Sequence, residues 1–235
     1  LLELLGILGG FDVGAMRHNG ADHLRLLAEA MKRVTIDREA HMGDPDFVPV
    51  PLDHLLSPAY HAELAGSIRR GERASVARVP PPEPPDTTVC CMMDEEGNAV
   101  SLTHTLGEPS GAIPAGLGFM LNGCMSGFDP RPGRAASIGP GKRRGSTMTP
   151  TIVFEDDAPS LVIGAPGGTF LVPALAQALS NVLDFGMSMS DDVAAPRMVA
   201  VSDAVDVSNR IPRSATAALE AEGYPVVRSY QSYAF

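Results

Sequence analysis

Asp86-Thr87-Thr88-Val89 follows the proline-rich run Val79–Pro85 and opens a strand-like segment. Cleavage between Asp86 and Thr87 would give Thr87 both a hydroxyl nucleophile and a free α-amine. An α-amine, with a pKa of about 7.7–8.0, suits a general base near neutral pH. One residue would then hold both catalytic functions. The same letters also fit a linker that runs into an ordinary strand, where a Thr-Thr pair is common.

Size and composition indicate a globular protein. The 235 residues could form one large domain or two small ones, and 44% hydrophobic residues are enough for a core. A net charge of −10 and a pI near 5.0 argue against nucleic acid or an anionic membrane as a partner, since both need clustered Lys and Arg. The one basic cluster, Lys142-Arg143-Arg144, lies in a glycine-rich loop and is more typical of a solvated or anion-contacting turn.

Cysteine and histidine usage indicates neither a disulfide framework nor a metal site. The three cysteines include two neighbours, Cys90 and Cys91, and the six histidines form no H-x-x-x-H or H-x-H pair. No apolar run of about 18 residues predicts a membrane span. We therefore expect no metal, no cofactor and no span. Because the chain starts at Leu1 without methionine, we also expect a piece of a longer protein, whose compartment stays open.

Three helices are predicted from apolar spacing and start signals. An amphipathic pattern covers residues 21–39. A second helix over about 59–70 would be started by Ser57 or Pro58. A third, with a strongly apolar side, is expected over about 169–185.

Two β-hairpins are predicted in the second half of the chain. The first joins Thr88–Met93 to Ala99–Thr105, and the second joins Pro150–Phe154 to Ser160–Ile163. Between them, residues 107–149 are rich in Gly, Pro and Ser with little periodicity. A loop region of that length in a compact domain is usually functional or disordered, and we favour the functional interpretation.

Several common catalytic motifs are missing from the sequence. It has no G-x-S-x-G elbow, and Gly139-Pro140-Gly141-Lys142 lacks the first glycine and the Ser or Thr of a P-loop. Gly164-Ala165-Pro166-Gly167-Gly168 follows a predicted strand and opens a predicted helix. The amides of Gly167 and Gly168 could therefore point together at an anion or a developing oxyanion. A plain tight turn fits the same letters.

Many separate motifs stand in a fixed order along nearly the whole chain. They are Ala30–Arg33, Asp37-Arg38, Gly43–Phe47, Thr87-Thr88, Asp94-x-x-Gly97-Asn98-Ala99-Val100-Ser101, Thr103, Thr105, Leu121-Asn122, Gly139-Pro140-x-Lys142-Arg143, Ser146–Val153, Gly164-x-Pro166-Gly167-Gly168 and Ala195-Pro196-Arg197. In this order they resemble the γ-glutamyltranspeptidase family. The first three motifs are similar to the end of that family's large subunit.

The resemblance implies an α+β fold, the four-layer αββα sandwich of the N-terminal nucleophile hydrolases, here as a partial chain. Residues 1–86 would be the mainly helical end of the large subunit, closed by the proline-rich linker. Residues 87–235 would be the catalytic small-subunit part, and both would belong to one domain. A precursor would cut itself into these two subunits. Family members are often periplasmic or secreted, and a homo-oligomer stays open for this chain.

The resemblance also implies the chemistry of each site residue. The Thr87 hydroxyl would attack the carbonyl of Asp86 during self-cleavage and later an amide carbonyl of a small-molecule substrate. Thr105 would orient Thr87, and the amides of Gly167 and Gly168 would stabilise the oxyanion, an interaction commonly worth about 3 kcal/mol. Acyl transfer to water would give hydrolysis, and transfer to an amine would give transpeptidation.

Substrate-binding residues match the family in one place and depart from it in another. Ser146 and Thr147 match the paired hydroxyls that bind the substrate's α-carboxylate. However, Gly107 stands where the family usually has asparagine, and Gly123–Phe128 reads Gly-Cys-Met-Ser-Gly-Phe in place of Asn-Gln/Glu-Met-Asp-Asp-Phe. The ammonium pocket has lost its acids, and a buried ammonium without its partners loses on the order of 2–5 kcal/mol of binding free energy.

Three functions therefore stay open from the sequence. The first is cleavage and transfer of γ-glutamyl or related amides. The second is a family member retuned as an amidohydrolase or acylase for glutaryl or oxamate-like substrates that lack the α-ammonium. The third is a noncatalytic structural or binding relative that keeps the fold and is not processed.

Overall fold

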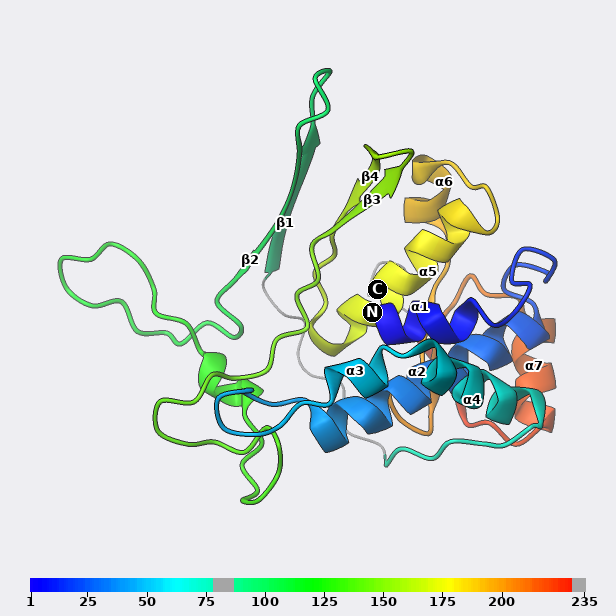
Figure 1. Cartoon of the computed structure of the whole chain (residues 1–235), viewed down its shortest axis with the longest axis horizontal. Coiled ribbons are helices and arrows are strands. Elements are labelled where there is room, and N and C mark those ends of the chain that lie inside the picture. The colour runs from blue at the N-terminus through cyan, green and yellow to red at the C-terminus, as the bar shows by residue number, and fades with distance from the viewer. Residues whose placement is uncertain (78–86, 230–235) are drawn as a thin grey trace. The chain divides into compact units, whose positions relative to one another are not determined.

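The structure, a computed structural model, describes residues 1–77 and 87–229 (Figure 1). The chain divides into two compact units, each assembled from separate stretches. Unit 1 consists of Leu1–His41, Val50–Pro81 and Ala176–Phe235, and unit 2 consists of Met42–Pro49 and Pro82–Leu175. The proline-rich run and Asp86, on which the cleavage prediction depends, lie outside the described residues.

Unit 1 is mainly helical. Its helices are α1 (Leu2–Leu8), α2 (Ala21–His41), α3 (Leu52–Leu55), α4 (Pro58–Arg69), α6 (Met189–Ala194) and α7 (Arg213–Ala221). The helix predicted over 21–39 is confirmed and ends two residues later. The second predicted helix is confirmed as α4, for which the Ser57 hydroxyl accepts a hydrogen bond from Tyr60 N and Pro58 is the first helical residue.

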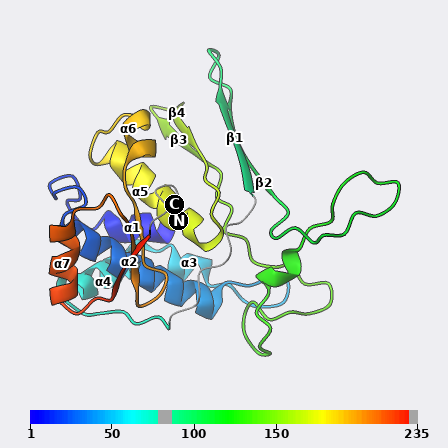
Figure 2. The ribbon, with the colours of Figure 1, turned by 180° about the vertical axis from the view of Figure 1, so that it is seen from behind.

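Helix α2 lies at the centre of the unit 1 core and contacts α1, α4 and α7 (Figures 1 and 2). Its apolar side chains Leu24 and Leu27 are fully buried. The same helix buries Glu29, whose carboxylate accepts hydrogen bonds from Arg33 Nη1 at 2.5 Å and Tyr224 OH at 2.8 Å. Because a buried charge is costly without partners, this network offsets part of the cost of burying the Glu29 carboxylate.

A small sheet completes unit 1. Strand β6 (Val205–Ser208) pairs antiparallel with β5 (Met198–Val199) and parallel with β7 (Val226–Ser229), and α7 makes the crossover between β6 and β7. Gln177 receives a hydrogen bond from Met198 N at 3.0 Å and donates one to Met198 O at 2.8 Å. Strands of two to four residues carry too little alternation to be recognised in a sequence, and none of the three was predicted.

Unit 2 contains the two predicted hairpins. Strand β1 (Thr87–Met93) pairs antiparallel with β2 (Ala99–Thr105), and β3 (Thr151–Glu155) pairs with β4 (Ala158–Ile163). Both hairpins are confirmed with small shifts at their ends. The second turns on Asp156-Asp157, both at positive φ (48° and 63°), the backbone of a tight two-residue hairpin turn.

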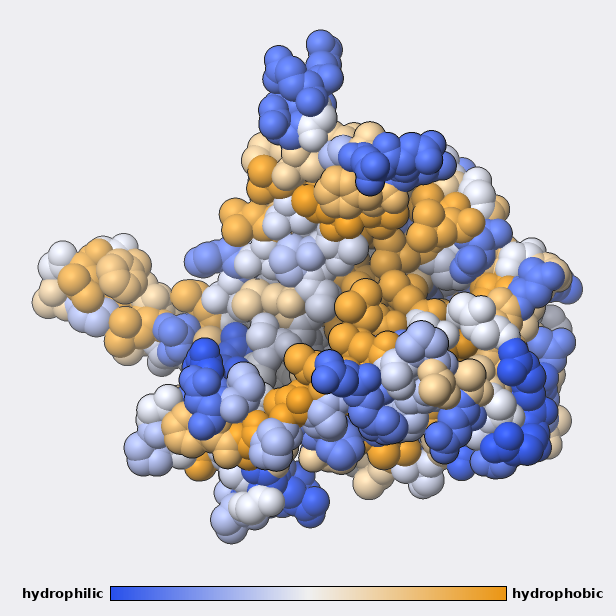
Figure 3. All heavy atoms as spheres, viewed as in Figure 1, coloured by the Kyte–Doolittle hydropathy of each residue, from blue (hydrophilic) through white to orange (hydrophobic). Residues whose placement is uncertain are grey.

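The long region between the hairpins forms one short element, the 3₁₀ helix η1 (Cys124–Gly127). Large apolar side chains in this region lie exposed, among them Ile113, Leu117 and Phe119. Figure 3 shows the loop that leaves β2, at the left of Figure 1, as largely hydrophobic surface. Unit 2 is therefore held more by backbone geometry and local hydrogen bonds than by a buried core.

The third predicted helix begins later than expected. A one-turn 3₁₀ helix, η2 (Gly168–Phe170), precedes α5 (Leu171–Leu183). Gly167 and Gly168 have φ values of 132° and 55°, which L side chains rarely adopt and an α-helix excludes. The glycine pair therefore delays the helix and shapes the backbone just before it.

Candidate active site

Antiparallel pairing brings two predicted site residues together. Thr87 lies opposite Thr105 in the register of β1 and β2. The Thr87 hydroxyl donates to Thr105 Oγ1 at 3.1 Å, and that oxygen also accepts from Gly107 N at 3.0 Å. The structure thus brings together the two hydroxyls that the sequence resemblance pairs, and the orienting role of Thr105 stays a prediction.

The two residues that follow β2, Leu106 and Gly107, pack against Cys124 in η1. Leu106 O accepts from Gly123 N at 3.0 Å and from Cys124 Sγ at 3.4 Å. Gly107 has a φ of 71°, and a Cβ built there would lie 3.2 Å from Cys124 Sγ. Gly107 and Cys124 are therefore complementary, because the thiol lies against the face from which a side chain at Gly107 would project.

The end of β4 is joined to the first hairpin. The Ser101 hydroxyl donates to Ile163 O at 2.9 Å, and a Cβ built at Gly164 would lie 2.7 Å from Val89 Cγ1. Only glycine fits such a close approach. This contact sets the Gly164–Gly168 segment beside the strand that begins at Thr87.

Gly167 and Gly168 use their carbonyls for local structure. Gly167 O accepts from Phe170 N at 2.9 Å, and Gly168 O accepts from Thr147 Oγ1 at 2.7 Å and from Leu171 N. The first N–H groups of a helix have no partner within it, so an anion near a helix start can bind them. That the amides of Gly167 and Gly168 serve in this way stays a prediction.

Of the predicted carboxylate-binding pair, Ser146 and Thr147, only Thr147 is hydrogen-bonded to the Gly164–Gly168 segment, all of which the structure describes. The Thr147 hydroxyl donates to Gly168 O, which joins it to this segment. The Ser146 hydroxyl instead accepts from Met148 N at 3.2 Å, within its own turn. The structure therefore links Thr87 to Thr105 and Thr147 to Gly168, all within unit 2.

An ionic clamp that sequence reasoning missed secures the loop before Ser146. Asp44 Oδ2 accepts from Arg143 N at 2.7 Å, Asp44 Oδ1 accepts from Arg143 Nη2 at 2.6 Å, and that nitrogen also binds Asp46. The Asp44 side chain is 1% exposed, and its hydrogen bonds from Arg143 hold the pKa of its carboxyl well below the usual range. Both partners stand in motifs of the family pattern, which is the signal that could have found them.

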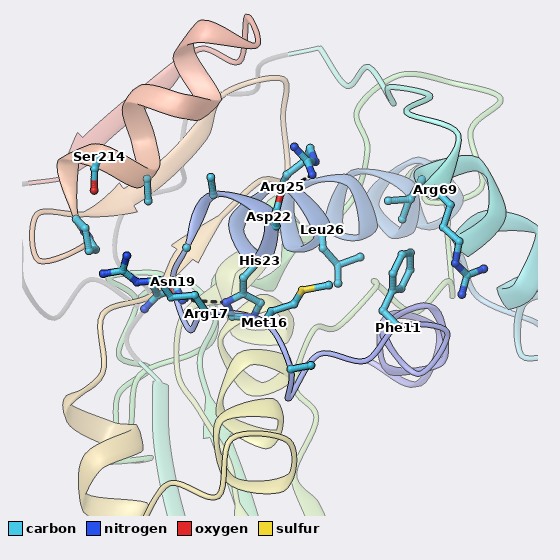
Figure 4. A pocket seen from close by; sticks show the side chains of 16 residues that line it. Phe11, Met16, Arg17, Asn19, Asp22, His23, Arg25, Leu26, Arg69 and Ser214 are labelled. Carbon is cyan, nitrogen blue, oxygen red and sulfur yellow. Dashed lines mark hydrogen bonds and ion pairs between the residues drawn. The ribbon is translucent and has the colours of Figure 1, made fainter.

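A cavity in unit 1 contains none of the predicted site residues. It has a volume of about 720 Å³ and lies between the start of α2, the end of α4 and the start of α7 (Figure 4). His23, which lines it, accepts a hydrogen bond from Asn19 N at 3.1 Å and packs against the Phe185 ring. Burial, aided by His18, lowers the pKa of His23 to about 4. The neutral imidazole belongs to the core of unit 1.

Comparison with known proteins places the chain in a family. The family model described as "Gamma-glutamyltranspeptidase" matches residues 1–234. The chain belongs to the γ-glutamyltranspeptidase family. Its α and β content matches that of solved structures of this family and of a related acylase.

Three relatives illustrate the range of this family. "Acylase ACY 1 proenzyme" from Pseudomonas sp. (strain V22) is 37% identical over 97% of this chain and 42% of that protein, and "Glutathione hydrolase proenzyme" from Pseudomonas aeruginosa is 39% identical over 84% and 38%. The crystal structure of cephalosporin acylase from Bacillus halodurans superimposes on 100% of this chain and 43% of that chain, with a TM-score of 0.86 and 25% identity. The chain thus spans about two fifths of the length of the curated relatives it matches.

Within residues 1–77 and 87–229, no group of three or more His, Cys, Asp or Glu side chains is placed to hold a metal ion. In the same ranges, no helix has the length and apolar character needed to cross a membrane.

Proposed function

We propose that this chain is the core of an autoprocessing enzyme in which Thr87 becomes an N-terminal nucleophile that cleaves γ-glutamyl or related amide bonds. The observation that carries the proposal is the hydrogen bond from the Thr87 hydroxyl to Thr105, made at the first residue of β1. Family membership supports it, and the whole protein would act on a small-molecule amide and transfer the acyl group to water or an amine.

Self-cleavage would proceed in two steps, an acyl shift from nitrogen to oxygen and the hydrolysis of the resulting ester. The Thr87 hydroxyl oxygen attacks the Asp86 carbonyl carbon, and the peptide C–N bond breaks as the ester C–O bond forms. Water then hydrolyses the ester, which leaves a carboxylate on Asp86 and frees both the hydroxyl and the α-amine of Thr87. Self-cleavage would thus divide the protein into two polypeptides, residues 1–86 and residues 87–235. Units 1 and 2 are different from these polypeptides, because they are defined by which residues lie together in the folded chain.

Turnover would reuse the same hydroxyl. The free α-amine takes the hydroxyl proton, the oxygen attacks the substrate carbonyl, and the amides of Gly167 and Gly168 stabilise the tetrahedral oxyanion. Collapse expels the leaving amine, which receives that proton. The acyl-ester on Thr87 is then attacked by water or by an acceptor amine. Ser146 and Thr147 would hold the carboxylate end of the acyl group.

The proposed architecture of the whole protein is the four-layer αββα sandwich, in which both chains of the processed precursor share one domain. The two hairpins of unit 2 would supply part of its sheets. Exposed apolar side chains on β1 and β2, such as Met92 and Leu102, are what such a partial sandwich should present.

A second candidate is an acylase for substrates without an α-ammonium. It is favoured by Ser126 and Gly127, which stand where the family has its paired acids, and by Gly107, which stands where the family usually has asparagine. The relatives named as acylases support it. The noncatalytic alternative requires an unprocessed chain.

Paired anilides separate these functions. Glutaryl-p-nitroanilide and γ-glutamyl-p-nitroanilide differ only in the α-ammonium, and we expect the full-length protein to hydrolyse the glutaryl compound much faster. A strong preference for the γ-glutamyl compound would contradict the acylase candidate and keep the threonine mechanism. An intact chain with no turnover of either compound would favour the noncatalytic relative.

A further inference from the structure

The geometry points to Arg144 as a specificity-determining residue that binds the anionic end of the acyl group. This inference deepens the proposed function and rests on it for the position of the reacting carbonyl. It assigns a positive charge to a place where the family carries acids, so that the recognition of the acyl group is inverted in sign. The ligand class is an acyl group that ends in a carboxylate.

Arg144 lies directly over Gly127. A Cβ built at Gly127 would lie 2.6 Å from Arg144 Cδ, so the arginine stem occupies the space that a side chain at this position would need. Gly127 is the last residue of η1, the segment aligned with the family's paired acids. The arginine at position 144, in this conformation, therefore needs a glycine at position 127, because a larger residue there would collide with its stem.

The three consecutive basic residues of this loop differ in what they bind. Lys142 Nζ donates to Ala135 O at 2.8 Å, and Arg143 is bound by Asp44 and Asp46. Arg144 is half-buried, and its guanidinium donates to Gly145 O at 3.0 Å. No carboxylate among the described residues forms an ion pair with it. Arg144 is thus the cation of the cluster that keeps its charge for a ligand.

Arg144 is also connected to the reacting groups from two sides. On one side, η1 begins at Cys124, which is bound to Leu106 next to Thr105 and its partner Thr87. On the other side, Arg144 precedes Ser146 and Thr147, and Thr147 is bound to Gly168. The clamp of Asp44 on the backbone and side chain of Arg143 fixes the loop at the preceding residue.

A cation at this point would act in two directions. It would attract a terminal carboxylate that Ser146 and Thr147 also contact, since guanidinium groups suit bidentate carboxylate binding. It would also repel the α-ammonium of a γ-glutamyl group, because like charges brought together lower affinity. Both effects favour a dicarboxylic monoamide over its amino-substituted analogue.

The test combines equilibrium binding with kinetics on the processed full-length protein. Glutarate and butyrate serve as binding probes in calorimetry, and glutaryl- and butyryl-p-nitroanilide serve as substrates, so each pair differs in the terminal carboxylate alone. We expect Arg144→Ala to weaken glutarate binding and to lower kcat/KM for the glutaryl compound about 10-fold or more, with kcat/KM for the butyryl compound unchanged. Arg144→Lys should retain part of the effect.

Arg134→Ala is the matched control, because Arg134 is an exposed arginine of the same glycine-rich region. It should bind glutarate and hydrolyse both anilides like the unmodified protein, and thermal unfolding should show that all variants are folded. Equal losses for glutaryl and butyryl compounds in Arg144→Ala, or unchanged glutarate binding, would overturn the role of Arg144 and leave the threonine mechanism standing. Arg144-dependent glutarate binding without hydrolysis of any anilide would support Arg144 and reject the proposed function.

Discussion

Units 1 and 2 are stabilised in different ways. Unit 1 buries α2 among neighbouring helices and satisfies its buried Glu29 with Arg33 and Tyr224. Unit 2 exposes large apolar side chains along its hairpins and loops. Among the described residues, twelve glycines have a positive φ, and all but Gly71, Gly186 and Gly223 belong to unit 2. Packing thus shapes unit 1, whereas backbone conformation and specific hydrogen bonds shape the candidate site in unit 2.

Substitutions in the two units should therefore separate stability from activity. Those in the core of unit 1 should unfold the protein without changing the chemistry of the folded molecules. Those in unit 2 should change the chemistry at little cost in stability.

The largest effect should come from Thr87. Thr87→Ala removes the nucleophile, so we expect loss of self-cleavage and a fall in amide hydrolysis of more than about 10³-fold, with the melting temperature nearly unchanged. Denaturing gels and anilide assays measure both. Thr88→Ala, at the next and exposed position of β1, is the control and should process normally. Cleavage that persists in Thr87→Ala would end the nucleophile assignment.

A substitution at Leu27 in unit 1 should lower stability and leave the chemistry unchanged, the reverse of the Thr87 result. Its side chain is 0% exposed in the middle of α2, so Leu27→Ala should lower the free energy of unfolding by about 3 kcal/mol. Chemical denaturation measures that loss, and kcat per folded molecule should stay the same. Ile36→Ala on the same helix, where the side chain is 40% exposed, should cost much less. A large fall in kcat for Leu27→Ala would break the separation between the units.

The Asp44 clamp should affect activity more than stability. Asp44→Asn keeps the shape but weakens the charge-assisted hydrogen bonds to Arg143. Because the weaker clamp should let the loop that carries Ser146 and Thr147 shift, kcat/KM should fall about 10- to 100-fold. Asp46→Asn, in which the replaced side chain is 73% exposed, is the matched control and should lose far less. Equal losses of kcat/KM in the two variants would show that the buried Asp44–Arg143 contact does not position the loop.

A smaller effect should appear as a pH dependence of unit 1. Burial lowers the pKa of His23 to about 4 in the folded chain, below the ordinary 6.5, so folding favours the neutral ring. The stability that depends on this ring is present above pH 6.5 and is lost as the pH falls toward 4.

Denaturation curves of a His23→Gln variant measure this contribution, since glutamine keeps an acceptor for Asn19 N. Its stability should fall less steeply between pH 6.5 and pH 4 than that of the unmodified protein. His104→Gln, at an exposed position of β2, should leave the steepness unchanged. Identical slopes for the unmodified protein and His23→Gln would contradict the assignment.

The elements that could be predicted are those with long patterns. Helix α2 and both hairpins follow from periodicity over five or more residues and from turn residues such as Asp94, which accepts hydrogen bonds from Glu96 N and Asn98 N. The sheet of β5, β6 and β7 could not be predicted, because its strands are too short to show alternation. Their pairing depends on tertiary contacts such as that of Gln177 with Met198.

The candidate site was proposed from sequence motifs, which give its residues but not their interactions. Family motifs identified Thr87, Thr105 and Thr147, and the structure supplies their hydrogen bonds. The different roles of Arg143 and Arg144 could not be read from two identical letters. The partner of Arg143 is Asp44, which lies 99 positions earlier in the chain, and no local pattern encodes such a contact.

The most direct test of the central claim is the mass and amino-terminal sequence of the polypeptides in the purified full-length protein. The proposed mechanism predicts two chains, with the smaller beginning at Thr87 and gaining the mass of one acyl group when a slowly hydrolysed amide substrate is added. A single polypeptide that remains intact across residues 86 and 87 would contradict it.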